Sequence, residues 1–250
     1  MSRRQFLNSP VDSISMEEAI ACVEEFIRSG QPHQIVPINA SKLWQMERNP
    51  RLSEIVTSAS LVIAERAILI GSRILGEPIK DHVGGIMLLK QLLPVANTRG
   101  YRMYFLGAKP EIINQMVTKL GSDYPAMQIV GWHHGYLNAE EGVRIISEIR
   151  ATKPDMLFVA MGTPKQEYWI AEHLQELGVP VCLGVGGSFD VLAGIKKDTP
   201  QWIRNMSMEW LYRLVQDPGN LWKRYFITIP WFIYKIFQLR LQRMRLSKQS

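Results

Sequence analysis

The first 190 residues alternate between short apolar runs and longer amphipathic stretches, a pattern that predicts strands separated by helices. Runs typical of buried strands occur at residues 34–38, 61–63, 103–106, 128–131, 155–161 and 179–185. Stretches typical of helices occur at residues 15–28, 40–47, 50–57, 65–75, 83–96, 110–120, 138–152 and 164–177. Strands that alternate with helices of this length favour parallel pairing. We therefore predict an α/β fold with a Rossmann-like, mostly parallel sheet flanked by helices.

The pattern changes after Gly194. Residues 196–222 are rich in Trp and Arg, and residues 227–246 are apolar and aromatic first and then basic at every second or third position. The apolar part is too short to span a bilayer and resembles an interfacial helix. A C-terminal helix packed on its own domain is the alternative. The aromatic side chains that suit the headgroup boundary of a membrane are Trp231, Phe232, Tyr234 and Phe237.

The net charge of +6 belongs to this tail. Residues 201–250 contain nine basic and two acidic side chains, which gives a net charge of +7 and leaves −1 for the rest. Such asymmetry indicates either nucleic acid or an acidic membrane surface as partner. Because Trp, Phe and Ile are interleaved with the basic residues, we predict an anionic membrane and no nucleic acid. The chain then divides into a catalytic domain at residues 1–195 and a helical, basic, amphipathic, membrane-associating appendage at residues 196–250.

Two observations concern the compartment. Cys22 and Cys182 both have apolar neighbours, which favours buried thiols in reducing surroundings. The N-terminus has no apolar stretch of signal length, and nowhere do about 18 uncharged apolar residues follow one another. We predict a cytoplasmic protein, peripheral on the inner face of the cell membrane.

Two strand-to-loop segments indicate the candidate chemistry. Residues 158–166 and 182–190 are apolar runs that break at glycine and then present polar side chains. Open α/β sheets bind ligands at such strand ends, and a helix that starts near Pro164 offers free backbone N–H groups to an anion. We therefore predict a nucleotide-dependent enzyme. A nicotinamide-dependent oxidoreductase does not fit, because no Gly-x-Gly-x-x-Gly follows a first strand.

Six ordered motifs carry a family resemblance over nearly the whole chain. They are PINA at 37–40, FLGA at 105–108, VGWHHGY at 130–136, MGTPKQE at 161–167, GVGGSFDVLAG at 184–194 and EWLYRL at 209–214. With these motifs the chain resembles the WecG/TagA/CpsF glycosyltransferases. The resemblance implies a Rossmann-like core, a membrane-associating appendage, and a chain that is able to form homo-oligomers.

The resemblance also implies an activity. It is the transfer, with inversion, of a hexose from a UDP-sugar to a polyprenyl-diphosphate-linked sugar, in the biosynthesis of capsule, exopolysaccharide or cell-wall polymer. The UDP-sugar is a co-substrate, and no cofactor or essential metal is implied. The transferred unit stays open between N-acetylmannosamine, its uronic acid, and a glucosyl or glucuronosyl unit. A catalytically silent UDP-sugar-binding partner of an assembly complex is the second hypothesis.

Matching positions supply the implied binding residues. Tyr136 matches an aromatic that stacks on uracil, and Asp190 matches a carboxylate that accepts bonds from ribose hydroxyls. An aromatic face suits a flat base, and a carboxylate accepts from two hydroxyls. The UDP-sugar neighbourhood is completed by Gly107, Gly162, Gln166, Gly186 and Gly187, and the diphosphate contacts are Arg213, Lys223 and Arg224.

The first half of the chain departs from the family where the catalytic base is expected. The usual aspartate segment is replaced by residues 63–66 (IAER), and the usual Arg-Val-x-Gly-x-Asp segment by residues 82–87 (HVGGIM). A base is needed because the acceptor hydroxyl loses its proton as it attacks. We predict Glu65 as that base and Asn39, which directly follows the strand at residues 34–38, as a further catalytic residue. His82 is a second candidate, either as base or as a phosphate contact. The alternative for Glu65 is a structural role, in which its negative charge complements the positive end of the dipole of the helix that it precedes.

The neighbouring His133 and His134 are a further candidate feature. Imidazole pairs hold metals when a carboxylate or cysteine stands at ligand spacing, and none does so along the chain here. We therefore predict no metal site.

Overall fold

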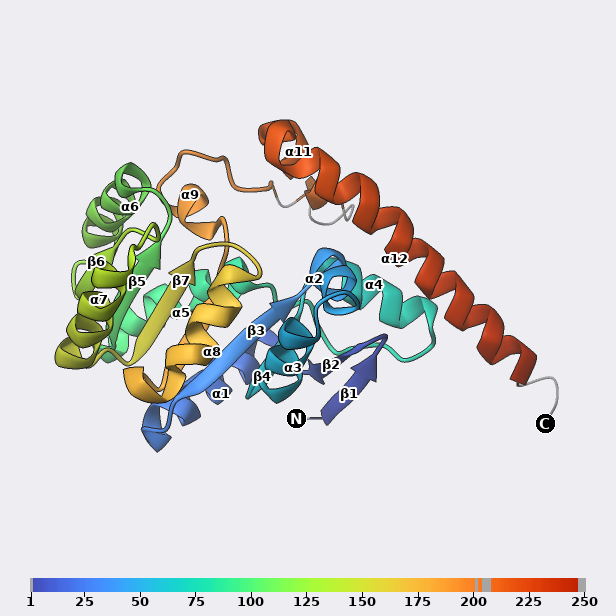
Figure 1. The fold of residues 1–250 in the computed structure, drawn as a ribbon, viewed down its shortest axis with the longest axis horizontal. Coiled ribbons are helices and arrows are strands. Elements are labelled where there is room, and N and C mark those ends of the chain that lie inside the picture. Colours follow the sequence, from blue (N-terminus) through green and yellow to red (C-terminus); the bar gives the residue numbers. More distant parts are fainter. Residues whose placement is uncertain (1, 201, 204–207, 247–250) are drawn as a thin grey trace.

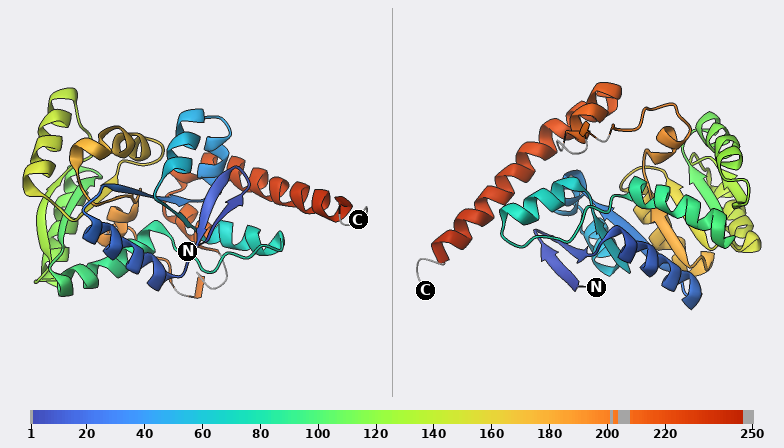
Figure 2. Two further views of the ribbon diagram at one scale, coloured as in Figure 1. Left: turned by 90° about the horizontal axis from the view of Figure 1, so that it is seen from below. Right: turned by 180° about the vertical axis from the view of Figure 1, so that it is seen from behind.

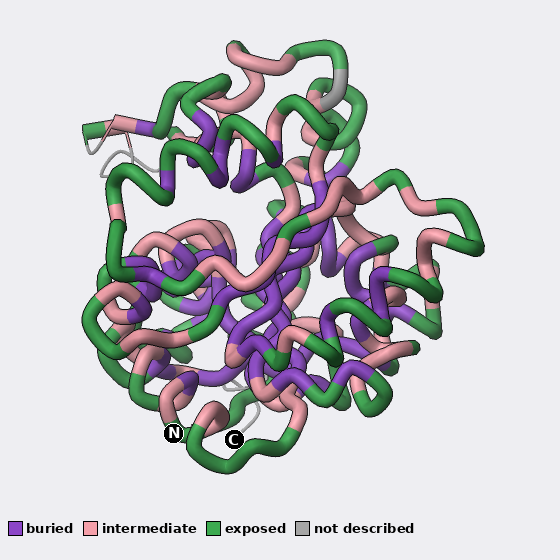
Figure 3. Tube along the Cα trace, turned by 90° about the vertical axis from the view of Figure 1, so that its left-hand side faces the viewer, coloured by how far each residue is buried: buried purple, intermediate pink, exposed green. Residues whose placement is uncertain are grey.

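The computed structural model describes residues 2–200, 202–203 and 208–246, and its centre is a six-stranded sheet (Figure 1). All neighbouring strands are parallel, in the order β4-β3-β8-β7-β5-β6. The strands are β3 (His33–Ile38), β4 (Leu61–Ala64), β5 (Arg102–Gly107), β6 (Gln128–His133), β7 (Met156–Ala160) and β8 (Val181–Gly184). The predicted α/β class with a mainly parallel sheet is confirmed. Figure 3 shows the buried positions concentrated in these central strands.

Helices cover both faces of the sheet, and three apolar clusters join them to it. On one face lie α1 (Met16–Ser29), α5 (Gly85–Arg99), α6 (Pro110–Asp123) and α9 (Ser188–Leu192). On the other lie α2 (Ala40–Met46), α3 (Pro50–Ser58), α4 (Arg66–Ile74), α7 (Ala139–Thr152) and α8 (Lys165–Leu177). Apart from the edge strand β6, the strands are buried on both faces, which explains their continuous apolar runs.

Local sequence signals fix several helix ends. The Ser15 hydroxyl accepts from Glu18 N, and the Glu18 carboxylate accepts from Ser15 N, so a complete capping box opens α1. Asn138 and Glu141 form the same motif at α7. Gly30 ends α1 in the left-handed conformation at φ 65°. Helix boundaries could therefore be predicted to within a few residues.

An N-terminal hairpin was not predicted. Strands β1 (Ser2–Phe6) and β2 (Ser9–Ser13) pair antiparallel outside the main sheet. Arg3 binds both oxygens of the fully buried Asp12 carboxylate, at 2.9 and 2.7 Å. Asp12 Oδ2 also accepts from Val62 N at 2.8 Å, so the hairpin satisfies a backbone donor on β4, the edge strand.

The C-terminal part consists of α11 (Glu209–Gln216) and the long helix α12 (Pro218–Leu246), whose last turns project beyond the body in every view of Figures 1 and 2. Phe232 and Ile236 are buried against the second apolar cluster. Phe232 is therefore wrongly predicted as a membrane-boundary residue, because it lies on the face that packs against the sheet domain. Tyr234 and Phe237 are 62% and 57% exposed. Among the described helices, none combines the length and apolar content that crossing a bilayer requires.

Candidate active site

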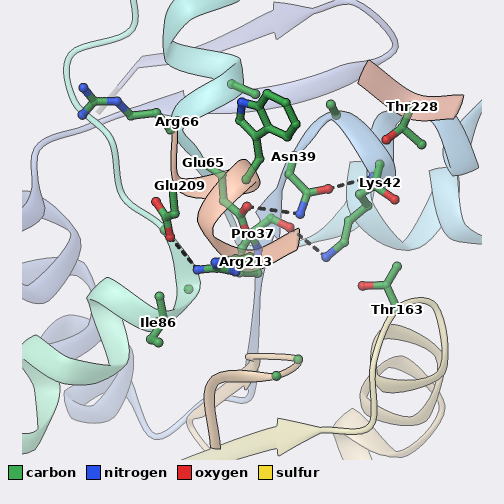
Figure 4. A pocket seen from close by; sticks show the side chains of 18 of the residues that line it. Pro37, Asn39, Lys42, Glu65, Arg66, Ile86, Thr163, Glu209, Arg213 and Thr228 are labelled. Atoms are coloured by element: carbon green, nitrogen blue, oxygen red, sulfur yellow. Dashed lines mark hydrogen bonds and ion pairs between the residues drawn. The ribbon is translucent and has the colours of Figure 1, made fainter. Parts of the chain in front are cut away.

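A cavity of about 460 Å³ opens at the carboxyl ends of β3, β4, β7 and β8. Its wall on one side is formed by the loops after these strands, and on the other by α11 and the first turns of α12. Figure 4 shows the polar side chains that point into it. Open parallel sheets bind ligands at this edge.

Asn39 and Glu65 form the polar base of this cavity. Each follows the last residue of its strand, and Ile38 of β3 lies beside Ala64 of β4 in the register. Asn39 Nδ2 donates to Glu65 Oε2 at 3.2 Å, while Asn39 Oδ1 accepts from Lys42 N at 2.9 Å and caps α2. The Glu65 side chain makes no capping hydrogen bond with α4. Its carboxylate is therefore held by Asn39 and faces the cavity.

A buried ion pair between Lys42 and Glu167 lies beside the base of the cavity. Lys42 Nζ lies 2.7 Å from Glu167 Oε1 and also donates to Pro37 O at 2.7 Å. Glu167 Oε1 further accepts from Gln166 Nε2 at 2.9 Å and from Thr163 Oγ1 at 3.4 Å. The pair joins α2 to α8, so it holds the β3 loop and the β7 loop in one arrangement.

Gln166 ties two glycine loops together. Its Oε1 accepts from Gly162 N at 3.2 Å and from Gly186 N at 3.0 Å. Both glycines have positive φ, 79° and 54°, which side chains other than glycine rarely adopt. The backbone N–H groups of these two glycines therefore already donate to Gln166. Gly187 also lines the cavity.

Arg213 carries positive charge into the cavity from α11. Its Nη2 donates to Glu209 Oε1 at 2.6 Å, one helical turn earlier. Burial alone lowers the pKa of the Arg213 guanidinium, but the carboxylates of Glu209 and Glu65 outweigh it and raise that pKa. Arg213 is therefore a permanent cation close to the predicted base (Figure 4).

His82 lines the same cavity and is 9% exposed. Burial lowers its pKa, although the carboxylates of Glu65 and Glu209 partly oppose the shift. An ideal Cβ on Gly84 would lie 3.2 Å from His82 Nε2 and 3.9 Å from Glu65 Cγ, so both side chains border this glycine. The structure thus brings together all three predicted catalytic residues, Asn39, Glu65 and His82.

Only two of the three predicted diphosphate-binding residues lie in the cavity lining. Arg213 and Arg224 line the cavity, whereas Lys223 does not. Lys223 directs its ammonium toward the Trp222 ring, 5.6 Å from the centroid. Consecutive residues of a helix point about 100° apart, which explains why only one of the neighbouring cations of α12 faces the cavity. A contact of Lys223 with a diphosphate stays a prediction that the cavity lining does not support.

Three of the predicted nucleotide residues, Tyr136, Gly107 and Asp190, are not among the residues that line the cavity. Tyr136 follows β6 at the far edge of the sheet and is 65% exposed. Gly107 ends β5, where an ideal Cβ would lie 2.5 Å from Ala160 O, so only glycine fits. Asp190 Oδ1 is 3.6 Å from Lys196 Nζ, and Asp190 Oδ2 is 4.0 Å from the Cβ position of Gly187. Tyr136 is thus separated by several strands from Glu65.

In the structure, the carboxylate of Glu141 lies close to the side chains of His133 and His134. Glu141 reaches them from α7, and the three ligating atoms lie within 4.8 Å of one another. A carboxylate therefore accompanies the pair in space although none stands at ligand spacing along the chain, and the absence of a metal site stays a prediction. His133 Nδ1 donates to His134 O at 2.9 Å, His134 Nδ1 accepts from Tyr136 N at 3.3 Å, and Glu141 Oε2 accepts from Asn138 N at 3.0 Å. These bonds hold the turn after β6.

Sequence reasoning missed Lys42, Glu167 and Glu209. Glu167 directly follows Gln166 in a motif, and Lys42 stands three residues after Asn39, so both had weak local signals. Their partnership spans 125 positions and follows only from the order of the strands. Glu209 opens α11, four residues before Arg213, which is the spacing of a helical ion pair.

Comparison with known proteins identifies the family of this chain. The model of the glycosyl transferase WecG/TagA/CpsF family matches residues 4–246. An N-acetylglucosaminyldiphosphoundecaprenol N-acetyl-beta-D-mannosaminyltransferase of Staphylococcus aureus strain MW2 is 36% identical over 230 residues, 90% of this chain and 88% of that protein. The protein of the same name from Bacillus spizizenii is 30% identical over 205 residues, 82% of this chain and 78% of that protein. With a family match that covers the sheet, the cavity and both C-terminal helices, this chain belongs to the WecG/TagA/CpsF family of glycosyltransferases.

Proposed function

We propose that this glycosyltransferase moves a hexosyl unit, with inversion, from a UDP-sugar to a sugar carried on a polyprenyl diphosphate. The observation that carries the proposal is the Asn39–Glu65 hydrogen bond at the base of a cavity whose opposite wall presents Arg213. N-acetylmannosamine is the unit we favour among the candidate hexoses, because the relatives from S. aureus and B. spizizenii are named for its transfer.

The proposed reaction follows from these side chains. The acceptor hydroxyl attacks the anomeric carbon from the face opposite UDP, and its proton passes to the Glu65 carboxylate. A new bond forms between that oxygen and the anomeric carbon, and the bond from this carbon to the diphosphate oxygen breaks with its electron pair. Arg213 stabilises the charge that develops on the departing diphosphate, and Arg224 lines the same cavity. The scheme needs no metal ion.

We further propose that α12 rests on the anionic inner face of the cell membrane. Its outward side chains include Phe226, Tyr234 and Phe237, which are 78%, 62% and 57% exposed. The exposed Arg240 and Arg245 follow them along the helix, whereas Arg243 pairs with Glu77 of the sheet domain. Vesicle flotation tests this point: Phe226→Ser combined with Phe237→Ser should reduce binding to anionic vesicles, and unchanged flotation at low salt would contradict it.

The activity is tested by UDP release from a panel of UDP-sugars, with N-acetylglucosaminyl-diphosphoryl-farnesol as acceptor. UDP-N-acetylmannosamine is the expected donor. Glu65→Gln should lower the rate by roughly 10²- to 10⁴-fold, the usual contribution of a general base, while UDP affinity stays unchanged. Glu54→Gln, at an exposed position of α3, is the matched control. Full activity of Glu65→Gln would refute the base, and silence of the wild type with intact UDP binding would favour the catalytically silent partner.

A further inference from the structure

The cavity changes character where α4 and α12 form its walls. Around the strand ends its lining is polar and includes Asn39, Glu65 and His82. Further along α4 and α12 the lining side chains are mainly apolar, and they are Ala67, Ile70, Ile229, Phe232 and Ile233. A nucleotide and two sugars offer hydroxyl, amide and phosphate groups to a protein. The apolar extension, which we call the α4–α12 groove, therefore suits a different part of a substrate.

Helical spacing places the apolar side chains of α12 on one side of the groove. Ile229 and Ile233 are four residues apart on α12 and share one face. The two helices are in contact at Gly71, where an ideal Cβ would lie 3.0 Å from Phe232 Cζ and 2.9 Å from Ile236 Cδ1. This close approach fixes α12 against α4, so the adjoining groove has a defined width.

Exposure within the groove indicates an apolar ligand. Ile70 and Ile233 line it, yet 36% and 49% of their surfaces are accessible. An alkyl or alkenyl chain between the helices would cover both side chains, and the removal of apolar surface from water favours binding.

The groove begins beside positive charge and continues toward the exposed face of α12. Arg213 of α11 and Arg224 of α12 line the same cavity as Glu65 and the groove side chains. Trp210 and Tyr225 also line it and pack edge to face, with ring centroids 6.3 Å apart. Cations followed by apolar walls match an amphiphile with a diphosphate head and a hydrocarbon tail.

We propose that the α4–α12 groove binds the first isoprene units of the polyprenyl chain of the acceptor. The proposal rests on the proposed function, since it assigns the part of the acceptor beyond the diphosphate. In this arrangement the diphosphate lies at Arg213 and Arg224, the acceptor sugar lies toward Glu65, and the rest of the lipid leaves along α12. The groove then selects acceptors by their lipid.

The test measures the affinity of the full chain for methyl, geranyl and farnesyl diphosphate by calorimetry, below the concentrations at which they form micelles. Each methylene that becomes buried should strengthen binding about fourfold. The wild-type protein should therefore bind farnesyl diphosphate at least about 100-fold more tightly than methyl diphosphate. Ile233→Gln should reduce the affinity for farnesyl diphosphate roughly tenfold and leave that for methyl diphosphate unchanged.

The matched control is Ile227→Gln. Ile227 and Ile233 lie on the same helix with 50% and 49% exposure, but only Ile233 lines the cavity. Ile227→Gln should bind all three diphosphates as the wild type does. Equal affinity for the three ligands would overturn the proposal. Equal loss in the two variants would also overturn it, because it would indicate adsorption on the outer surface of α12.

Kinetics separate this proposal from the proposed function. With N-acetylglucosaminyl diphosphates of the same three alcohols, Ile233→Gln should raise KM for the farnesyl acceptor and leave kcat for the methyl acceptor unchanged. Tail-dependent binding without any sugar transfer would refute the proposed function and support the groove. Transfer at equal KM for all three acceptors would refute the groove and support the function.

Discussion

Asn39 Nδ2 donates a 3.2 Å hydrogen bond to Glu65 Oε2 and so joins the ends of two neighbouring strands of the sheet. The orientation of the amide is set by the backbone, since Asn39 Oδ1 accepts from Lys42 N and caps α2. The donor end of the amide must then face Glu65. A helix cap and a predicted catalytic carboxylate are therefore parts of one local structure.

Two substitutions of Asn39 separate these roles. Asn39→Ala loses the cap and should lower the free energy of unfolding by about 1 kcal/mol. Asn39→Asp keeps a capping oxygen but replaces the amide donor with a second carboxylate, which repels the Glu65 carboxylate. We expect lower activity from Asn39→Asp and a pH–rate profile shifted to higher pH. Urea denaturation and pH-dependent UDP release provide the measurements, and a wild-type profile for Asn39→Asp would contradict the role of the bond.

The buried pair of Lys42 and Glu167 gives a second prediction, on stability. Their side chains are 4% and 1% exposed, and Glu167 Oε2 has no hydrogen-bond partner among the described residues. Lys42→Met leaves an uncompensated buried carboxylate and should cost about 3–5 kcal/mol. Adding Glu167→Gln to Lys42→Met should recover part of this loss. Urea denaturation of the four members of this double-mutant cycle measures the coupling, and purely additive effects would rule it out.

The sequence was most informative where local rules act. Capping residues, apolar runs and glycine ends predicted the strands of the main sheet and most helices, because each depends on a few neighbouring residues. The strand Ser2–Phe6 was missed because four of its five side chains are exposed and carry no apolar alternation. The buried partnership of Lys42 with Glu167 was missed because it depends on long-range packing.

The candidate site was predicted less completely than the fold. Glu65 and Asn39 were each predicted as catalytic candidates, and the pairing of β3 with β4 makes them neighbours. Tyr136 does not line the cavity that Gly186 lines, because it follows β6 at the edge of the sheet opposite β4. Its contact with the nucleotide stays a prediction. Residues at parallel strand ends share an edge of the sheet, yet only the order of the strands determines which of them meet.

His82 gives a prediction for pH-dependent stability. Its folded-state pKa lies below the ordinary value of 6.5 because burial disfavours the charged ring. As the pH falls below about 6.5, His82 binds a proton in the unfolded chain but stays neutral in the folded protein. The free energy of unfolding therefore decreases as the pH falls through this range. His82→Asn should show a weaker loss of stability than the wild type between neutral and acidic pH. Thermal denaturation across this range measures the difference, and parallel curves for the two proteins would contradict the assignment.

Gly71 gives a prediction for the docking of α12. An ideal Cβ there would lie 2.8 Å from Phe6 Cζ and 3.0 Å or less from atoms of Phe232 and Ile236, so Gly71→Val should force α12 away at a cost of about 1–3 kcal/mol. Gly121→Val is the control, because Gly121 also lies within a helix and its Cβ would meet no atom within 4 Å.

Limited trypsin digestion tests this docking, since Lys235 and Arg243 of α12 both form ion pairs with the sheet domain, at 2.7 and 2.9 Å. Gly71→Val should be cut at these positions faster than the wild type and should lose transferase activity, because Phe232 also lines the cavity. Gly121→Val should match the wild type in both measurements. Equal cleavage of the two variants would mean that the Gly71 contact does not hold α12, and that the cavity wall depends on the ion pairs alone.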